Sequence, residues 1–255
     1  MIRSYRNVIP EKYELSSSIK DFVGNKSRFV GKWKRYVNSM SATADSRRLA
    51  KSQSYHAIVQ ELGPILHFLQ EFMRRYLPGL YSHFKRTRKL FNNYVATVTK
   101  NPLMYQTQTP LSSTEIDVLS EDFMGIFTLF CLGHNSGRSE DIHVDGNNMQ
   151  YGYNLLVPFG SFHGGVMQLP EVGVEIELMD RDLFVFDAVF YKHTLTKVIG
   201  ERYSLIAFEC RLAVKQMYEF NHITEASMAV GRYVDDNWFK HVGLTRRFNP
   251  LQTAV

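Results

Sequence analysis

A series of short apolar runs between residues 123 and 213 limits the fold of this chain more than any other feature. Seven or eight runs follow one another, with Gly, Pro, Asp and Asn between them: MGIFTLFCLGH, YGYNLLVPFG, GGVMQL, VGVEIELM, DLFVFDAVF, HTLTKV and RYSLIAFECRL. Short apolar or alternating runs bounded by such residues are typical of β-strands. Because no helical pattern lies between them, we predict an antiparallel barrel or jelly roll.

The sequence before this region favours helices. From Ser54 to Tyr76 apolar residues recur every three or four positions, which predicts an amphipathic helix with a kink or break near Pro64. Pro78 and Gly79 end it, and a second basic helix is expected over residues 80–93. Residues 1–50 are polar and basic, and the stretch 40–54 is expected to be loop or a weakly held helix.

The composition is that of one globular domain. Apolar residues make up 44% of the 255 residues and charged residues 22%, so the chain should form a core. We predict an α+β fold with a mainly β core and N-terminal helices packed on one sheet. The single domain, 1–255, is divided into a basic, mostly helical part (1–110), the β core (120–213) and a C-terminal extension (214–255) with one or two short helices.

The sequence also limits where the protein works. No run of 18 or more uncharged apolar residues is present, and the first residues lack the apolar stretch of a signal peptide. We therefore expect an intracellular protein, nuclear or cytoplasmic, without a membrane partner. The two cysteines, Cys131 and Cys210, lie in strand-like runs and are interpreted as reduced core thiols.

The stretch DIHVDGNN, residues 141–148, places an imidazole and a carboxylate two residues apart. On a strand, His143 and Asp145 share one face and could bind one ion. The alternative is a surface histidine before an Asp-Gly turn. His193, which opens the run HTLTKV, could supply a third ligand, or it could be a hydrogen-bonded core histidine; His134, His163 and His222 are rival third ligands.

Two imidazoles and one carboxylate form a facial triad that leaves three positions open on non-haem Fe(II). Two of them can take a 2-oxo acid and the third O2. Such a co-substrate has a distal carboxylate that needs a cation, and a guanidinium provides the bidentate match. Arg202 and Ser204 follow His193 and would share a strand face. Alternatively, Arg202 and Glu201 form a charge pair at the rim.

The order H-x-D, His, R-x-S on short strands resembles the Fe(II)/2-oxoglutarate-dependent dioxygenases, over roughly residues 120–213. The resemblance implies a double-stranded β-helix (jelly-roll) core and one dioxygenase domain. It implies His143, Asp145 and His193 as catalytic metal ligands, with Fe(II), 2-oxoglutarate and O2 as cofactors and co-substrates. Arg202 and Ser204 are implied to hold the 2-oxoglutarate carboxylate.

One branch of that superfamily is more similar. HVDGNN has the form H-x-D-x-x-N, which resembles the TET/JBP group that oxidises the methyl group of 5-methylcytosine or thymine in DNA. The resemblance implies Asn148 as a substrate-binding residue that contacts the base, although Asn also suits any turn. Val144 departs from the pattern, because a basic residue is common there, and no cysteine-rich zinc-binding segment is present.

Basic residues concentrate in the first hundred residues among several aromatic ones. This arrangement suits a nucleic acid, DNA rather than RNA, with phosphates next to stackable bases; the alternative is a solvated helix face. The leading hypothesis is oxidation of a methylated base. The first rival is a 2-oxoglutarate-dependent hydroxylase of a protein side chain or small molecule. The second is a non-catalytic nucleic-acid-binding module on the same fold.

Overall fold

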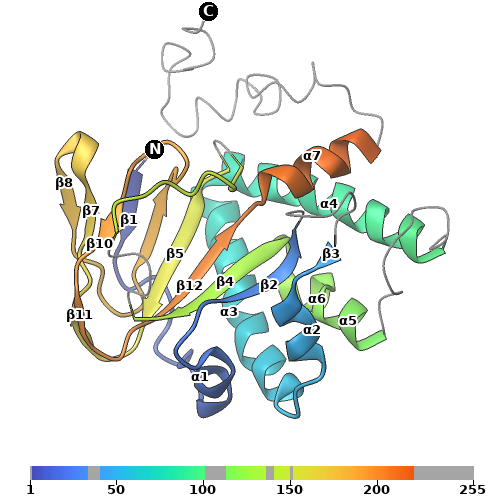
Figure 1. Ribbon diagram of the computed structural model, residues 1–255, viewed down its shortest axis with the longest axis horizontal. Helices are drawn as coiled ribbons and strands as arrows, with labels where there is room; N and C mark the ends of the chain where they lie inside the picture. The colour runs from blue at the N-terminus through green and yellow to red at the C-terminus, as the bar shows by residue number, and fades with distance from the viewer. Residues whose placement is uncertain (1, 34–40, 101–112, 136–140, 150–151, 221–255) are drawn as a thin grey trace, which may run out of the picture.

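The computed structural model describes residues 2–33, 41–100, 113–135, 141–149 and 152–220 (Figure 1). Its centre is a seven-stranded antiparallel sheet in the order β1-β9-β5-β12-β4-β2-β3. The strands of this large sheet are β1 (Ile2–Tyr5), β2 (Arg28–Trp33), β3 (Ser41–Ala42), β4 (Leu129–His134), β5 (Asn154–Phe159), β9 (Leu183–Phe186) and β12 (Tyr203–Phe208).

Two small sheets lie beside the large one, at the left of Figure 1. One has the order β10-β7-β8 and the other pairs β11 with β6. Their strands are β6 (Phe162–Gly164), β7 (Met167–Leu169), β8 (Val174–Ile176), β10 (Thr194–Leu195) and β11 (Val198–Gly200), with a 3-10 turn at Pro170–Val172. The prediction of short antiparallel strands over 123–213 is confirmed, together with the mixed helix and sheet class.

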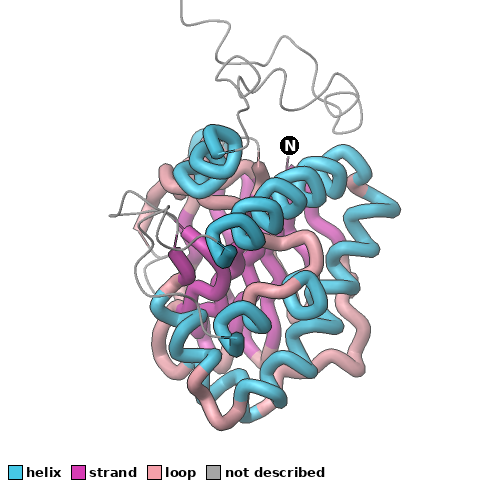
Figure 2. The backbone as a smooth tube through the Cα atoms, turned by 90° about the vertical axis from the view of Figure 1, so that its right-hand side faces the viewer, coloured by secondary structure: helices cyan, strands magenta, loops and turns pink. Residues whose placement is uncertain are grey.

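Helices cover one face of the large sheet, as Figure 2 shows. They are α1 (Ser17–Val23), α2 (Ala44–Ala50), α3 (Tyr55–Tyr76), α4 (Pro78–Lys100), α5 (Ser113–Val118), α6 (Glu121–Met124) and α7 (Arg211–Phe220). The predicted helix over 54–76 is confirmed. We expected a kink or a break near Pro64. A break is wrong, because α3 continues through Pro64. Pro64 is exposed on this helix, whereas its neighbours Gly63 and Ile65 are buried.

The large sheet has an apolar core on each face because neighbouring residues of a strand point to opposite sides. In β12, Leu205 and Ala207 belong to the core under the helices, whereas Ile206 also contacts the core between the sheets. The second core contains Leu156, Met167, Leu169, Leu178, Phe184, Phe186, Ala188 and Leu195. The large and small sheets are therefore two packed layers.

The first fifty residues contribute more structure than the sequence predicted. β1 pairs with β9 and β2 pairs with β4, so both join the large sheet. Within the stretch 40–54, α2 is capped by Thr43, whose side chain accepts from the amide of Ser46, and it buries Leu49. These strands were missed because their partners are about a hundred residues or more away in sequence. The predicted C-terminal helices beyond α7 lie outside the described residues. Over the part of the chain that is described, no helix combines the length and the apolar character needed to cross a membrane.

Candidate metal centre

Two segments fifty residues apart in sequence lie side by side at the opening between the sheets. His143 and His193 form an antiparallel bridge, in which each amide donates to the other residue's carbonyl at 3.0 and 2.9 Å. The amide of Asp145 donates to the carbonyl of Ala188 at 2.8 Å. H-x-D precedes β5 of the large sheet, and His193 precedes β10 of a small sheet. The backbone hydrogen bonds between His143 and His193 fix the distance between these two segments.

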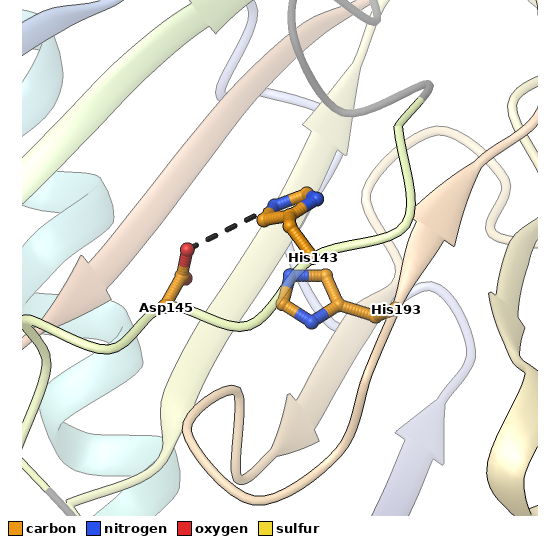
Figure 3. Close-up of side chains that lie close together, drawn as sticks. All are labelled: His143, Asp145 and His193. Carbon is orange, nitrogen blue, oxygen red and sulfur yellow. Dashed lines mark ion pairs between the residues drawn. The ribbon is translucent and has the colours of Figure 1, made fainter.

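The side chains of His143, Asp145 and His193 converge (Figure 3). One ligand atom from each lies within 4.8 Å of the others, and the two imidazole centroids are 4.3 Å apart. His143 Nε2 is 3.9 Å from Asp145 Oδ1. Among the described residues, no other group of three His, Cys, Asp or Glu side chains is arranged in this way. The predicted convergence is therefore a feature of the fold.

Both imidazoles are held in the orientation that a metal ligand needs. His143 Nδ1 donates to the carbonyl of Asp141 at 2.6 Å, and His193 Nδ1 donates to the carbonyl of Tyr191 at 3.0 Å. A proton on Nδ1 leaves the lone pair on Nε2 free for a metal ion. Burial lowers the pKa of His193, although the Tyr191 carbonyl and the Asp145 charge oppose this effect. Burial thus favours the neutral, ligating form.

The Asp145 carboxylate is hydrogen-bonded on one oxygen. Oδ2 accepts from Asn148 Nδ2 at 3.2 Å and from Asn154 Nδ2 at 3.0 Å, and Asn148 Nδ2 also donates to Asn154 Oδ1 at 3.0 Å. The other oxygen, Oδ1, lies toward His143. The structure thus places Asn148 beside the candidate metal ligands, where its amide nitrogen is bonded to protein.

The three side chains open into a cavity of about 290 Å³ that Arg202 and Ser204 also line. Arg202 is 1% exposed, and its Nη1 donates to Ser204 Oγ at 2.9 Å. Its Nε and Nη2 are buried and find no hydrogen-bond partner within the described part of the chain. Burial lowers the pKa of Arg202 to about 10, so the guanidinium remains charged at neutral pH. A buried cation with two unused donors fits a carboxylate.

The surroundings hold Arg202 in this position. Its amide donates to Asn135 Oδ1 at 3.1 Å, and its carbonyl accepts from the Asn135 amide at 2.5 Å. The Phe162 ring lies 5.5 Å from the guanidinium carbon. Gly165 has φ of +63°, and a Cβ there would come within 3.4 Å of Arg202 Cδ and 3.5 Å of its Nε. Glycine is favoured at this position by its positive φ, because L side chains rarely adopt that backbone conformation.

The rival third ligands within the described residues are not among the converging side chains, although His134 lines the same cavity. The ring of His134 packs on Tyr203 with centroids 4.7 Å apart, and His163 is exposed on β6. His222 lies outside the described residues. Cys131 and Cys210 are buried and are not joined in a disulfide, as predicted, and burial raises the pKa of Cys131 to about 12.

Sequence reasoning missed Asn135 and Asn154. Asn154 is 4% exposed at the start of β5, inside the otherwise apolar run YNLLVPF. A lone amide in a buried strand needs hydrogen-bond partners, and that signal could have identified it. Asn135 follows β4 in a sequence typical of turns, and only its φ of +54° and its pairing with Arg202 distinguish it.

No protein-family model and no curated protein matches this sequence. Among solved structures, NgTET1 in complex with 5mC DNA aligns with a TM-score of 0.58 at 15% identity, over 88% of this chain and 80% of that one. A 2OG-Fe(II) oxygenase family protein from Burkholderia pseudomallei aligns with a TM-score of 0.29 at 18% identity, over 41% of this chain and 61% of that one. OsALKBH1 aligns with a TM-score of 0.32 at 8% identity, over 82% and 96%.

The first of these alignments alone carries the fold assignment. It extends over most of both chains, so this protein shares the fold of NgTET1. The resemblance to the TET-like 2-oxoglutarate oxygenases, read from the motifs, is therefore confirmed at the level of the fold.

Proposed function

We propose that this chain, which has the fold of a TET-type structure, is an Fe(II)- and 2-oxoglutarate-dependent dioxygenase that oxidises the methyl group of a methylated base in nucleic acid. Its large sheet and the two small sheets packed beside it would form the double-stranded β-helix core of such an enzyme. One observation carries the proposal: two imidazoles and a carboxylate within 4.8 Å of one another share a cavity with a buried guanidinium.

The residues fit both groups that this chemistry requires. Two neutral imidazoles and one carboxylate suit non-haem Fe(II) and leave positions for further ligands. Arg202 has two buried donors that no atom of the described residues accepts, and a carboxylate of 2-oxoglutarate would accept from both. When bound, iron with 2-oxoglutarate supplies the oxidising power: O2 and 2-oxoglutarate are consumed, succinate and CO2 form, and one oxygen atom enters a C–H bond.

The protein's own residues have three tasks in this reaction. His143, Asp145 and His193 bind the iron from one side, because the backbone bridge sets their separation. Arg202 and Ser204 orient the co-substrate through its carboxylate. The apolar wall of the cavity, which includes Leu156, Met167, Phe186, Leu195 and Ile206, keeps water away from the reacting carbon.

The proposed substrate is a 5-methylcytosine-type base, in DNA rather than RNA. NgTET1, which shares this fold, was solved in complex with 5mC DNA. Asn148 lines the cavity, and both hydrogens of its amide nitrogen are directed to Asp145 and Asn154. Toward a base it can therefore offer only Oδ1, an acceptor. An acceptor matches the exocyclic amine of cytosine and not the carbonyl O4 of thymine, which favours methylcytosine.

A basic groove supports nucleic acid as the partner. It has a volume of about 570 Å³ and is lined by Ser18, Asp21, Phe22, Arg28, Arg48, Lys51, Ser52 and Ser54. Ser27 lines the site cavity and the next residue, Arg28, lines the groove, so the two cavities flank the start of β2. Arg28 is paired with Asp45 at 3.3 Å, so the exposed side chains of Arg48 and Lys51 are the cations of the groove that could bind phosphate.

The groove is tested by the salt dependence of DNA binding. Arg48→Ala and Lys51→Ala should each weaken binding to methylated duplex DNA equally for all sequences and reduce the log–log salt slope by about 1. Arg74→Ala is the control, because Arg74 lies at the other end of α3 and pairs with Glu71. Unchanged slopes for Arg48 and Lys51 would place the phosphate contacts elsewhere.

The chemistry is tested by anaerobic loading with Fe(II), followed by 2-oxoglutarate, O2 and DNA or RNA carrying methylated bases. We expect succinate together with oxidised methylcytosine in the digested nucleosides, measured by mass spectrometry. His143→Ala should abolish both products and retain DNA binding, and Arg202→Lys should raise the KM for 2-oxoglutarate. Succinate with unchanged nucleosides would point to a protein or small-molecule substrate. A chain that takes up no iron would be a binding module.

A further inference from the structure

The carboxylate of Asp145 is held asymmetrically, by two amides on the same oxygen. Asn154 Nδ2 and Asn148 Nδ2 both donate to Oδ2, at 3.0 and 3.2 Å, while Oδ1 lies 3.9 Å from His143 Nε2. A third hydrogen bond, from Asn148 Nδ2 to Asn154 Oδ1 at 3.0 Å, closes the triangle. The two oxygens of one candidate ligand therefore have different surroundings.

The orientation of both amides follows from the carboxylate. An ionised carboxylate only accepts hydrogen bonds, so each asparagine must turn its Nδ2 toward Asp145. Asn154 then presents Oδ1 to Asn148, and that oxygen accepts the second hydrogen of Asn148 Nδ2. Bonds to an ionised acceptor are shorter and stronger than those between neutral groups, so the triangle specifies one arrangement.

The two amides are supported from different parts of the fold. Asn154 begins β5, a central strand between β9 and β12, and it pairs with Phe186. Asn148 is 7% exposed and forms a bridge with Cys210, just after β12. Asn154 therefore stands on the large sheet, which holds a side chain more precisely than a loop does. Asn148 lies outside the strands, and its backbone bridge holds it beside the segment that follows β12.

The bridge to Cys210 is itself fixed by neighbouring contacts. The Met149 amide donates to the carbonyl of Glu209 at 2.7 Å, and the Arg211 amide donates to the carbonyl of Asn147 at 2.9 Å. The side chain of Glu209, which is fully buried, lies 2.5 Å from His83 Nε2 of α4. The segment after H-x-D is therefore connected to α4 in two steps. Its backbone is bonded to the segment that contains Glu209, and the Glu209 side chain contacts His83.

We infer that Asn154 and Asn148 are positioning residues that hold Oδ2 of Asp145 and direct Oδ1 alone to the metal, an inference that rests on the proposed iron site. With Oδ2 engaged, Asp145 binds through one oxygen, and three coordination positions stay open for co-substrates. Without the amides, the carboxylate can rotate or bind through both oxygens, which occupies one of those positions.

Metal binding measured without turnover tests this inference. We expect Asn154→Leu, which keeps the volume and removes the donor, to weaken Mn(II) binding by about 10- to 100-fold in anaerobic calorimetry. Asn154→Asp should weaken it also, because it replaces a donor by an acceptor beside Asp145. Asn148→Ala should have a smaller effect, since Asn154 still donates to Oδ2. Asn147→Ala is the matched control, because the Asn147 side chain makes none of these bonds to Asp145. The Mn(II) affinity of this variant should equal that of the wild type.

A spectroscopic readout separates positioning from general destabilisation. Co(II) bound to the wild type and to Asn154→Asp should differ in the intensity of its visible d–d absorption, which reports coordination number, while both proteins give the same circular dichroism. Suppose that the wild type binds Mn(II) and that the Asn154 variants have the same affinity and the same Co(II) spectra. That result would overturn the positioning role and leave the proposed function standing. Wild-type protein without divalent metal binding would overturn both.

Discussion

At the scale of single residues, environment assigns roles that residue type leaves open. Asn148 was interpreted from its place in H-x-D-x-x-N as a contact to the substrate base. Its amide nitrogen is directed to Asp145 and Asn154, so Oδ1 is the atom left for a contact with a base. Arg202 differs from Asn148, because two of its buried donors have no protein acceptor among the described residues. These donors are therefore available to a ligand.

The burial of Lys32 in β2 should lower the stability of the folded protein at pH values where the side chain is charged. Its side chain is 4% exposed, with the rings of Phe91 and Tyr94 at 5.5 and 5.3 Å from Nζ. Burial first, and then the charges of Arg88 and Arg47, lower the pKa of Lys32 from 10.5 to about 8. The charged form is therefore disfavoured in the folded state.

This shift predicts a pH dependence of stability. Between about pH 8 and 10.5 the folded chain has lost the Lys32 proton and the unfolded chain still binds it, so stability rises with pH in that window. The free energy of unfolding of the wild type, relative to Lys32→Met, should increase by about 2 kcal/mol from pH 7 to pH 10. Urea denaturation of both proteins at both values measures it, and a difference that stays constant would show that the pKa is not lowered.

At the scale of elements, packing overrides local preference in α3. Pro64 lies inside a continuous 22-residue helix whose buried side includes Ile58, Leu62, Ile65 and Leu66. A proline cannot donate to the carbonyl four residues earlier and crowds it. The apolar contacts of the helix with the sheet and with α4 and α6 therefore outweigh that local cost.

Replacing this proline should stabilise the protein. We expect Pro64→Ala to raise the free energy of unfolding by about 1 to 3 kcal/mol, because it restores the amide donor and improves helix propensity at an exposed position. Ser82→Ala, at an exposed site of α4 without a proline, should change stability by less than about 0.5 kcal/mol. Thermal or urea unfolding measures both, and a loss of stability in Pro64→Ala would mean that the proline stabilises the folded chain at this position.

At the scale of the whole molecule, the metal centre joins two layers. His143 and Asp145 precede β5 of the large sheet, and His193 precedes β10 of the small sheet. A metal ion bound by all three would therefore link the sheets. Binding to the folded state alone stabilises a protein by about 2.7 kcal/mol at a hundred times the Kd.

Metal removal should accordingly lower thermal stability. With saturating Mn(II) and no O2, we expect Tm to rise by roughly 5 to 10 °C over protein treated with chelator, given about 2–4 °C per kcal/mol for chains of this size. His143→Ala should show little of this rise, as followed by differential scanning calorimetry. An equal rise in that variant would indicate that the metal binds at a different place.

The local pattern of residues by itself determined the strand-rich centre, the helix over 54–76 and the candidate ligands, because period and residue type are local properties. His143, Asp145, His193, Arg202 and Ser204 were named from their order in the chain, and the structure brings all five to one cavity. Only the tertiary structure decided that β1 and β2 complete the large sheet, that Asn135 and Asn154 support the site, and which atoms of Asn148 are engaged. Each of these depends on a hydrogen bond between segments distant in sequence, or on a partner that no local pattern indicates, and such contacts exist only once the layers have packed.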